Sequence, residues 1–315
     1  MKVISFVIPV YNEEDAVGLF LTEMHKIHES LPDKQYIFEY IFVNDGSTDR
    51  TQEVLEDHIK KWLPVRVVNF SRNFWKEPAL FAWLTYADGD ACIPIDVDLQ
   101  DDISIIPDML MKWEEGYSVV LAQRKKRKDG PIKRLTSSIF YGIFNTVSSV
   151  NIPHNSWDFR LMDRYTYKTV ASMTESNLFM RGMLSWPGTK TATIEFERKE
   201  RIKWTTKYNL WKSWNYAWDG FTSFSDVPLR FWSYLGLMIA SFSFIYGVFI
   251  VLKTVITWVE TPGFASTIVV VLFLGGIQLM SIGIMGEYIG RIFMETKKRP
   301  RYLVKNTIGF DEKKD

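Results

Sequence analysis

The sequence predicts an α/β fold, in which a mostly parallel sheet carries helices on both faces and two transmembrane helices follow near the C terminus. Between residues 3 and 123, apolar runs of strand length alternate with segments whose apolar residues recur at helical spacing. Polar turn residues such as Asn44 to Gly46 follow the apolar runs. Residues 231–252 and 264–286 form stretches of 22 and 23 residues without a charge, each long enough to span a bilayer.

Composition limits the class of protein. The chain has 315 residues, and its 47% apolar content allows a substantial core, which excludes a disordered protein. A formal net charge of +1 gives no general attraction for nucleic acid, so no nucleic-acid partner is expected. The single cysteine, Cys92, excludes an internal disulfide and fits a reducing compartment.

The first strand is predicted at residues 3–10, because polar and acidic residues follow this short apolar run where a signal peptide would have a cleavage site. Residues 13–29 then carry apolar side chains at helical spacing. The further elements predicted in chain order are a strand at 36–43, a helix capped within 44–49 and running to about 62, a strand at 65–70, a helix at 78–87, a strand at 91–97, a helix at 104–115 and a strand at 119–123.

Residues 93–101 contain the most informative pattern. Asp96 and Asp98 follow a buried apolar run, and their i, i+2 spacing would place both carboxylates on one side of an extended backbone. Two hard oxygen ligands suit Mg²⁺ or Mn²⁺ shared with a diphosphate, although two solvated loop aspartates would give the same pattern. In such sheets ligands bind beyond the carboxyl ends of the strands, where Asp45 also falls.

Three motifs, at residues 9–13 (PVYNE), 44–49 (NDGSTD) and 96–101 (DVDLQD), resemble those of family 2 inverting glycosyltransferases with a GT-A fold. Motifs at 71–74, 76–82, 158–162, 177–182 and 286–291 narrow the resemblance to polyprenyl-phosphate glycosyltransferases, in particular the bacterial bactoprenol glucosyltransferases. The resemblance covers residues 3 to about 304.

The resemblance implies roles in binding a sugar-nucleotide donor. Glu13 and Asp45 would contact the ribose and base, while Gln100 would lie near the sugar or the acceptor. Alternatively, Glu13 is an acidic first-turn residue that stabilises a helix dipole. The implied donor-site residues are Pro9, Tyr11, Glu13, Asp45, Lys76 and Asp96, with Asp96 and Asp98 as ligands of Mg²⁺ or Mn²⁺.

Asp158 is the candidate catalytic base by the same resemblance, and Arg160 beside it would orient or neutralise a phosphate. A structural ion pair between these two residues is the alternative. An acceptor phosphate monoester is already largely dianionic at neutral pH, so Asp158 could instead orient the sugar or the acceptor. Asp98 and Gln100 complete the implied catalytic set.

Two basic clusters precede amphipathic segments. Residues 124–134 lead into 135–150, the pattern of an interfacial helix that meets anionic lipid, although an ordinary surface helix fits equally well. Residues 198–208 precede 210–224, whose tryptophans are typical of a membrane boundary. The residues expected to hold the acceptor phosphate are Arg124, Arg134, Arg201, Lys207 and Tyr208.

Charge around the two apolar stretches predicts their orientation. Basic residues follow the second stretch, whereas the loop between the stretches holds only Lys253 and Glu260, so both flanks are expected in the cytoplasm. The predicted domains are a cytoplasmic catalytic domain at 1–228 with its juxtamembrane helices, a two-helix transmembrane domain at 229–293 and a cytoplasmic basic segment at 294–315 that ends in a solvated tail. The resemblance implies a bacterial inner-membrane homotetramer that hands its product to a lipid-linked-sugar flippase and a downstream transferase.

Four tryptophans depart from the family pattern. Trp75, Trp83 and Trp204 replace a usual glycine, and Trp157 replaces a small residue. Glycine at such loops often supplies a positive φ or a close backbone approach, so these changes bear on the shape of the donor pocket.

The expected activity is inverting, metal-dependent transfer of a hexose, glucose from UDP-glucose, to undecaprenyl phosphate at the cytoplasmic face, for modification of O-antigen or another surface polysaccharide. Alternatives are the same reaction with GDP-mannose, UDP-GlcNAc or a modified pentose, and a non-catalytic scaffold that binds a sugar nucleotide. A processive synthase is disfavoured, because the chain lacks a QxxRW motif and has only two apolar stretches.

Overall fold

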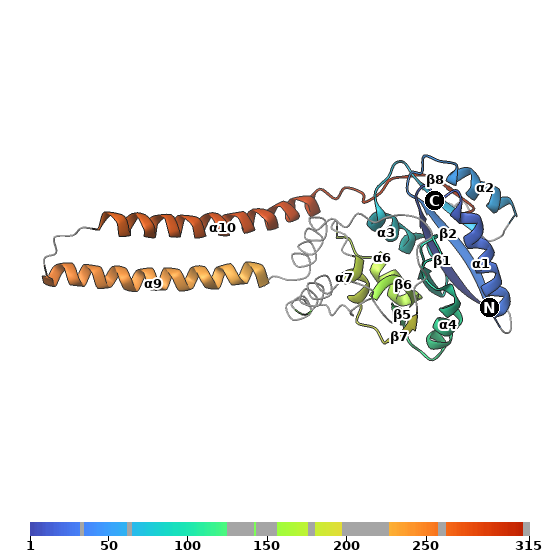
Figure 1. The fold of residues 1–315 in the computed structure, drawn as a ribbon, viewed down its shortest axis with the longest axis horizontal. Coiled ribbons are helices and arrows are strands. Elements are labelled where there is room, and N and C mark those ends of the chain that lie inside the picture. Colours follow the sequence, from blue (N-terminus) through green and yellow to red (C-terminus); the bar gives the residue numbers. More distant parts are fainter. Residues whose placement is uncertain are drawn as a thin grey trace. The chain divides into compact units, whose positions relative to one another are not determined.

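The computed structural model describes residues 1–31, 35–61, 65–124, 142, 156–175, 180–196, 227–257 and 263–310. The chain divides into two units, which are described separately (Figure 1). The first unit comprises residues 1–217 and 299–315, and the second comprises residues 218–298.

The first unit contains an eight-stranded mixed sheet with the strand order β7-β5-β6-β4-β1-β2-β3-β8. Its strands are β1 (Lys2–Val10), β2 (Tyr36–Asn44), β3 (Val65–Phe70), β4 (Ala91–Pro94), β5 (Val119–Arg124), β6 (Ser156–Asp163), β7 (Thr191–Phe196) and β8 (Val304–Ile308). Its helices are α1 (Ala16–Ser30), α2 (Thr51–Lys61), α3 (Lys76–Tyr86), the short 3₁₀ helix η1 (Ile103–Ile105), α4 (Ile106–Glu114), α6 (Arg164–Ala171) and α7 (Met180–Ser185).

The centre of the sheet is parallel, as the sequence predicts. Strand β1 pairs with β2 from Lys2↔Tyr36 to Val10↔Asn44, and with β4 on its other side. Helical crossovers impose this direction, since each strand must return to the same edge before the next begins. Strands β6 and β8 run antiparallel to their neighbours, so the sheet is mixed.

Alternation along the strands builds the main core. Ile4, Phe6 and Ile8 of β1 are fully buried on the face that also contacts Phe20 of α1 and Ile106 of α4. Because side chains alternate between faces, these residues belong to one hydrophobic cluster with α1, α2, η1 and α4. The elements nearest the centre of this sheet therefore have little freedom to shift in register.

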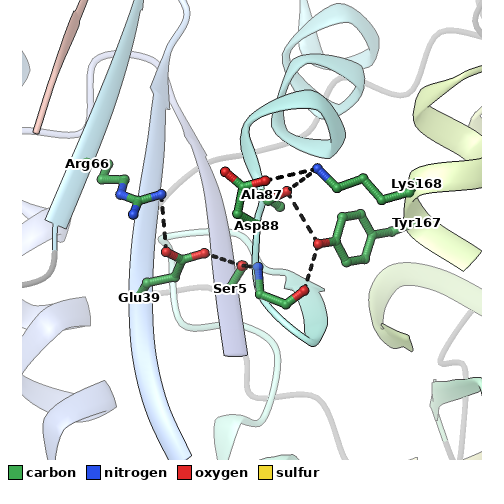
Figure 2. Close-up of polar contacts among 8 residues, drawn as sticks. Ser5, Glu39, Arg66, Ala87, Asp88, Tyr167 and Lys168 are labelled. Carbon is green, nitrogen blue, oxygen red and sulfur yellow. Dashed lines mark hydrogen bonds and ion pairs between the residues drawn. The ribbon is translucent and has the colours of Figure 1, made fainter. Parts of the chain in front are cut away.

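The opposite face holds a buried polar network, which Figure 2 shows. Glu39 accepts a hydrogen bond from the hydroxyl of Ser5 and forms an ion pair with Arg66, with 3.3 Å between Oε2 and Nη1. Ser5 also accepts from the Gly89 amide at 2.9 Å, and the Tyr167 hydroxyl donates to the Gly89 carbonyl at 2.7 Å. This network joins β1, β2 and β3 to the turn before β4 and to α6.

The observed elements differ from the predicted ones in two places that matter for the site. The strand predicted at 91–97 ends at Pro94, so Asp96 and Asp98 lie beyond its end, with Asp98 in a turn. The solvated tail predicted for residues 306–315 is wrong for residues 306–308, because these belong to β8, which pairs with β3.

The second unit contains α9 (Val227–Thr257) and α10 (Phe264–Thr296), which contact each other (Figure 1). Large apolar side chains on both are exposed, among them Phe244 at 73% and Leu279 at 71%. Within the described residues, neither of these helices nor any other has the combined length and apolar character needed to cross a membrane.

Candidate functional site

Three parallel strands end side by side and bring polar loops together. The Asp45 amide, directly after β2, donates to the Val10 carbonyl at the end of β1 at 2.9 Å. The Ile95 amide, directly after β4, donates to the Val7 carbonyl at 3.0 Å. The loops that follow β1, β2 and β4 therefore start at one edge of the sheet, which is where ligands bind in folds of this class.

The loops after β1 and β2 are tied together by hydrogen bonds. Asn12 adopts a φ of 56°, a conformation that Asn tolerates better than most residues. Its amide donates to the Ser47 hydroxyl at 3.0 Å, and its Oδ1 accepts from the Thr48 amide at 2.8 Å. The Glu13 amide donates to Thr51 Oγ1 at 2.8 Å, which fixes the backbone of the predicted donor-site residue Glu13.

Pro9 and Tyr11 lie on either side of the end of β1. Pro9 is the half-buried penultimate residue of the strand, whereas Tyr11 follows it with 46% of its surface exposed. Both are at the predicted edge of the sheet, and the exposed ring of Tyr11 is accessible to a ligand.

Asp45 is buried, with 5% exposure, and its Oδ1 accepts a hydrogen bond from the Phe74 amide at 2.7 Å. Burial raises the pKa of Asp45, and the opposing effects of the Phe74 and Trp75 amides and of the Arg72 charge do not cancel that rise. Beside it, Gly46 has a φ of 69°, and a Cβ there would lie 2.5 Å from the Arg72 carbonyl carbon. The loop after β3 is thus packed directly over Asp45 and Gly46.

Asp96 and Asp98 occupy the turn after β4. Lys76 Nζ, at the start of α3, lies 3.1 Å from Asp96 Oδ2, and both side chains are partly exposed. Asp98 is exposed, and its two carboxylate oxygens accept hydrogen bonds from the backbone amide and the side-chain amide of Gln100. Leu99 between them has a φ of 52°, which turns the chain so that Gln100 reaches back to Asp98.

The site has a negative electrostatic field. Burial is the main cause that raises the pKa of Glu13. The negative charges of Asp98, Asp49 and Asp96 raise this pKa further, which shows that Glu13 lies within electrostatic reach of both aspartates of the DxD motif. Among the described residues, no group of three or more His, Cys, Asp or Glu side chains has the geometry of a metal site.

Arg160 and Asp158 belong to β6. Arg160 is only 2% exposed and lies in the interior of the strand, where it pairs in register with Leu121 of β5. The Asp158 backbone is part of the same strand, but its side chain lies outside the described part of the chain, as does that of Arg124 at the end of β5.

Several predicted features lie wholly outside the described residues. These are Arg134, Arg201, Lys207, Tyr208 and Trp204, together with the amphipathic segments predicted at 135–150 (apart from Gly142) and 210–224.

Two contributors to the site are not among the site residues that the sequence predicts. Arg72 and the Phe74 amide act on Asp45 from a loop that follows the next strand, 27 and 29 positions further along the chain. Both belong to the motif at 71–74, and this motif was the available signal.

Comparison with known proteins agrees with this arrangement. The model of the Glycosyl transferase family 2 matches residues 5–174, and that of the GtrB C-terminal hairpin matches residues 227–292. The chain is 49% identical to the prophage bactoprenol glucosyl transferase homolog of Escherichia coli (strain K12), over 96% of this chain and 98% of that protein. It is 47% identical to the bactoprenol glucosyl transferase of Shigella phage SfX, over 96% and 99%.

The similarity to solved structures is weaker. Mannosyl-3-phosphoglycerate synthase from Rubrobacter xylanophilus superposes with a TM-score of 0.47 and 18% identity, over 69% of this chain and 71% of that one. The sequence matches decide the class: the chain belongs to glycosyl transferase family 2 and is a glycosyltransferase.

Proposed function

We propose that the protein transfers glucose from UDP-glucose to undecaprenyl phosphate with inversion at the anomeric carbon. The observation that carries this proposal is the cluster of Asp45, Asp96, Asp98 and Glu13 around adjacent strand ends, in a chain nearly half identical over its whole length to proteins named bactoprenol glucosyl transferases. The alternative is the same reaction with a different sugar from another nucleotide donor, which this site would also accommodate.

On the donor side, Asp45 and Glu13 bind the ribose and base next to the backbone of Pro9 and Tyr11. A buried carboxylate held by the Phe74 amide is well suited to this role, because its position does not depend on the ligand. Lys76 carries the positive charge that a diphosphate requires, and it already lies 3.1 Å from Asp96 at the same edge.

The donor set fits a divalent cation. Asp96 and Asp98 supply hard carboxylate oxygens, and after the larger effect of burial their negative charges help to raise the pKa of the neighbouring Glu13. Asp96 and Asp98 would hold Mg²⁺ or Mn²⁺, which when bound neutralises the charge that develops on the departing diphosphate.

The reaction is a single displacement. An oxygen of the acceptor phosphate attacks the anomeric carbon from the face opposite UDP, the new carbon–oxygen bond forms, and the bond to UDP breaks with its electron pair going to the diphosphate. A dianionic phosphate monoester has no proton to lose, so Asp158 orients the sugar or the acceptor rather than acting as an obligatory base. Gln100, which donates to Asp98, lies beside the sugar, and Arg160 supports the acceptor side from within β6.

The acceptor is held at a membrane surface. In this proposal Arg124, Arg134, Arg201, Lys207 and Tyr208 bind its phosphate, and residues 229–293 anchor the protein in the bacterial inner membrane with the catalytic unit on the cytoplasmic side. Support comes from the two uncharged stretches of the sequence, from the exposed apolar side chains of α9 and α10 and from the match to a C-terminal hairpin. We further propose that the protein forms a homotetramer and that its lipid-linked product passes to a flippase and then to a downstream transferase.

The test is transfer of radiolabelled sugar into organic-extractable lipid by the purified full-length protein in detergent, with undecaprenyl phosphate and a panel of UDP- and GDP-sugars. We expect labelling from UDP-glucose that EDTA abolishes and added Mg²⁺ or Mn²⁺ restores. Labelling from another donor alone would identify a different sugar. Binding of UDP without labelling from any donor would contradict the proposal and favour a scaffold.

Asp98→Asn provides the matched variant, because it keeps the shape of the side chain and removes the charge that a cation needs. We expect it to lose transfer while keeping membrane insertion and UDP binding in the absence of metal. Asp108→Asn, on α4, changes an acidic residue to the same extent outside the strand-end cluster and should transfer normally.

A further inference from the structure

The C-terminal segment returns to the catalytic sheet and contacts the loop that holds Asp45. Strand β8 pairs antiparallel with β3, and its register shifts between Asn69 and Phe70, directly before that loop. Beyond the shift, the Ser71 amide donates to the Leu303 carbonyl at 2.9 Å, which extends the contact into the loop itself.

A chain of ring contacts leads from Tyr302 to Asp45. The Tyr302 ring stacks on Phe70, with centroids 4.9 Å apart and an angle of 14° between the planes. Phe70 meets Phe74 edge to face at 5.8 Å, and the Phe74 amide donates to Asp45 Oδ1 at 2.7 Å. Phe70 is 3% exposed, so it has little room to move without displacing both neighbouring rings.

The loop itself has few alternative positions on the Asp45 side. A side chain at Gly46 would collide with the backbone of Arg72 and Asn73, which shows how closely the two loops approach. Arg72 also lies 4.0 Å over the Phe74 ring. Phe70 thus contacts the ring of Phe74 in this loop and the ring of Tyr302 in the C-terminal segment.

We propose that Tyr302 is a positioning residue for the donor site, acting through Phe70 and Phe74 to fix the amide that holds Asp45. This inference rests on the proposed role of Asp45 in binding the nucleotide. It assigns a function to the segment that follows helices α9 and α10 in the sequence. Helix α10 ends at Thr296, so only five residues lie between that helix and Tyr302 along the chain.

The same segment offers a matched control at its far end. Phe310 meets Tyr86 edge to face at 5.4 Å and lies 5.3 Å from the Arg66 guanidinium. It anchors the segment by ring contacts of the same kind, but it touches neither Phe70 nor Phe74 in any described contact. Replacing it removes a comparable anchor at a site away from Asp45.

The experiment compares Tyr302→Ala, Tyr302→Phe and Phe310→Ala in the full-length protein, by calorimetric titration with UDP and by hydrogen–deuterium exchange of peptides that cover residues 70–75. We expect Tyr302→Ala to weaken UDP binding about three- to tenfold, the range of a lost aromatic pair, and to speed exchange of the Phe74 amide. Tyr302→Phe and Phe310→Ala should bind UDP within about twofold of the wild type and leave that amide protected.

Equal effects of Tyr302→Ala and Phe310→Ala on both readouts would overturn the inference, because they would indicate a loss of general stability. Unchanged UDP affinity and unchanged exchange in Tyr302→Ala would also overturn it. The exchange measurement needs no donor, so it separates this inference from the proposed function: a wild type that binds no UDP would contradict the donor site, while the Phe74 amide would still report on Tyr302.

Discussion

Lys76 offers a prediction in which one substitution has opposite effects on two ligands. In the free protein its ammonium lies 3.1 Å from Asp96 Oδ2, so it occupies the negative field in which we place a cation. When the donor is bound, the same ammonium is proposed to contact the diphosphate. Lys76→Met removes the charge and keeps most of the length of the side chain.

The magnitude follows from the ion pair. At 3.1 Å in a medium close to water, two unit charges attract by about 1.3 kcal/mol, and an exposed pair of this kind contributes at most about 1 kcal/mol. Removing Lys76 should therefore strengthen Mn²⁺ binding to the free protein about fivefold, since about 1 kcal/mol of competition disappears. Binding of UDP in the presence of metal should weaken about tenfold, because a charge-assisted hydrogen bond is lost.

The assay is titration of Mn²⁺ followed by electron paramagnetic resonance, together with calorimetry of UDP at saturating Mn²⁺. Lys168→Met is the control, because Lys168 forms a similar exposed pair with Asp88, also at 3.1 Å, away from the strand-end cluster. A Lys76→Met variant that loses affinity for both ligands would refute the reasoning, since it would mean that Lys76 holds the Asp96 loop in place. No change in either affinity would remove Lys76 from the site.

Three further predictions concern stability, measured as the free energy of unfolding of the full-length protein in detergent. Arg66→Met should cost about 2 to 3 kcal/mol, because it removes the positive charge beside the buried carboxylate of Glu39. Adding Glu39→Gln should recover part of that loss, and additive effects of the two substitutions would contradict the ion pair. Trp75→Gly should be more stable than Trp75→Ala by about 1 kcal/mol, because only glycine adopts a φ of 74° without backbone strain. The indole is exposed, so its loss is expected to cost little in either variant, and equal stabilities would contradict backbone strain at this position. The hydrogen bonds from Lys2 are the main cause that lowers the pKa of Glu114. The ionised Glu114 should therefore add a small amount to the free energy of unfolding above pH 4.5, and this contribution should disappear as pH falls through the lowered pKa. Glu114→Gln should remove that pH dependence, and an unchanged dependence of the free energy of unfolding on pH would contradict the prediction.

The periodic part of the fold could be predicted from the sequence. Strand β3 has the predicted bounds, and β2 and β5 differ by one residue at one end, because turn residues bracket short apolar runs. Strand β8 could not be predicted, since four of its five residues are exposed and no apolar alternation marks it. Its place depends on pairing with β3, more than 200 residues away in sequence, which local propensity does not encode.

The site shows the same division. Asp45 and Asp96 fall at strand ends as predicted, because the parallel connections force those ends to one edge. The strand predicted to reach Val97 ends at Pro94, so the prediction that Asp96 and Asp98 lie on or directly after an extended strand is wrong. The positive φ of Leu99 lets Gln100 bond to Asp98, which the sequence did not indicate. Trp75, which stands where the family usually has glycine, adopts a positive φ of 74°.

The most direct test of the central claim is the anomeric configuration of the lipid product. The protein should be incubated with undecaprenyl phosphate and UDP-glucose labelled with ¹³C at the anomeric carbon, and the extracted glucosyl lipid examined by NMR. Single displacement from the α-linked donor predicts a β-glucosyl phosphate. An α-linked product would contradict the account, because retention of configuration cannot result from a single attack on the face opposite UDP.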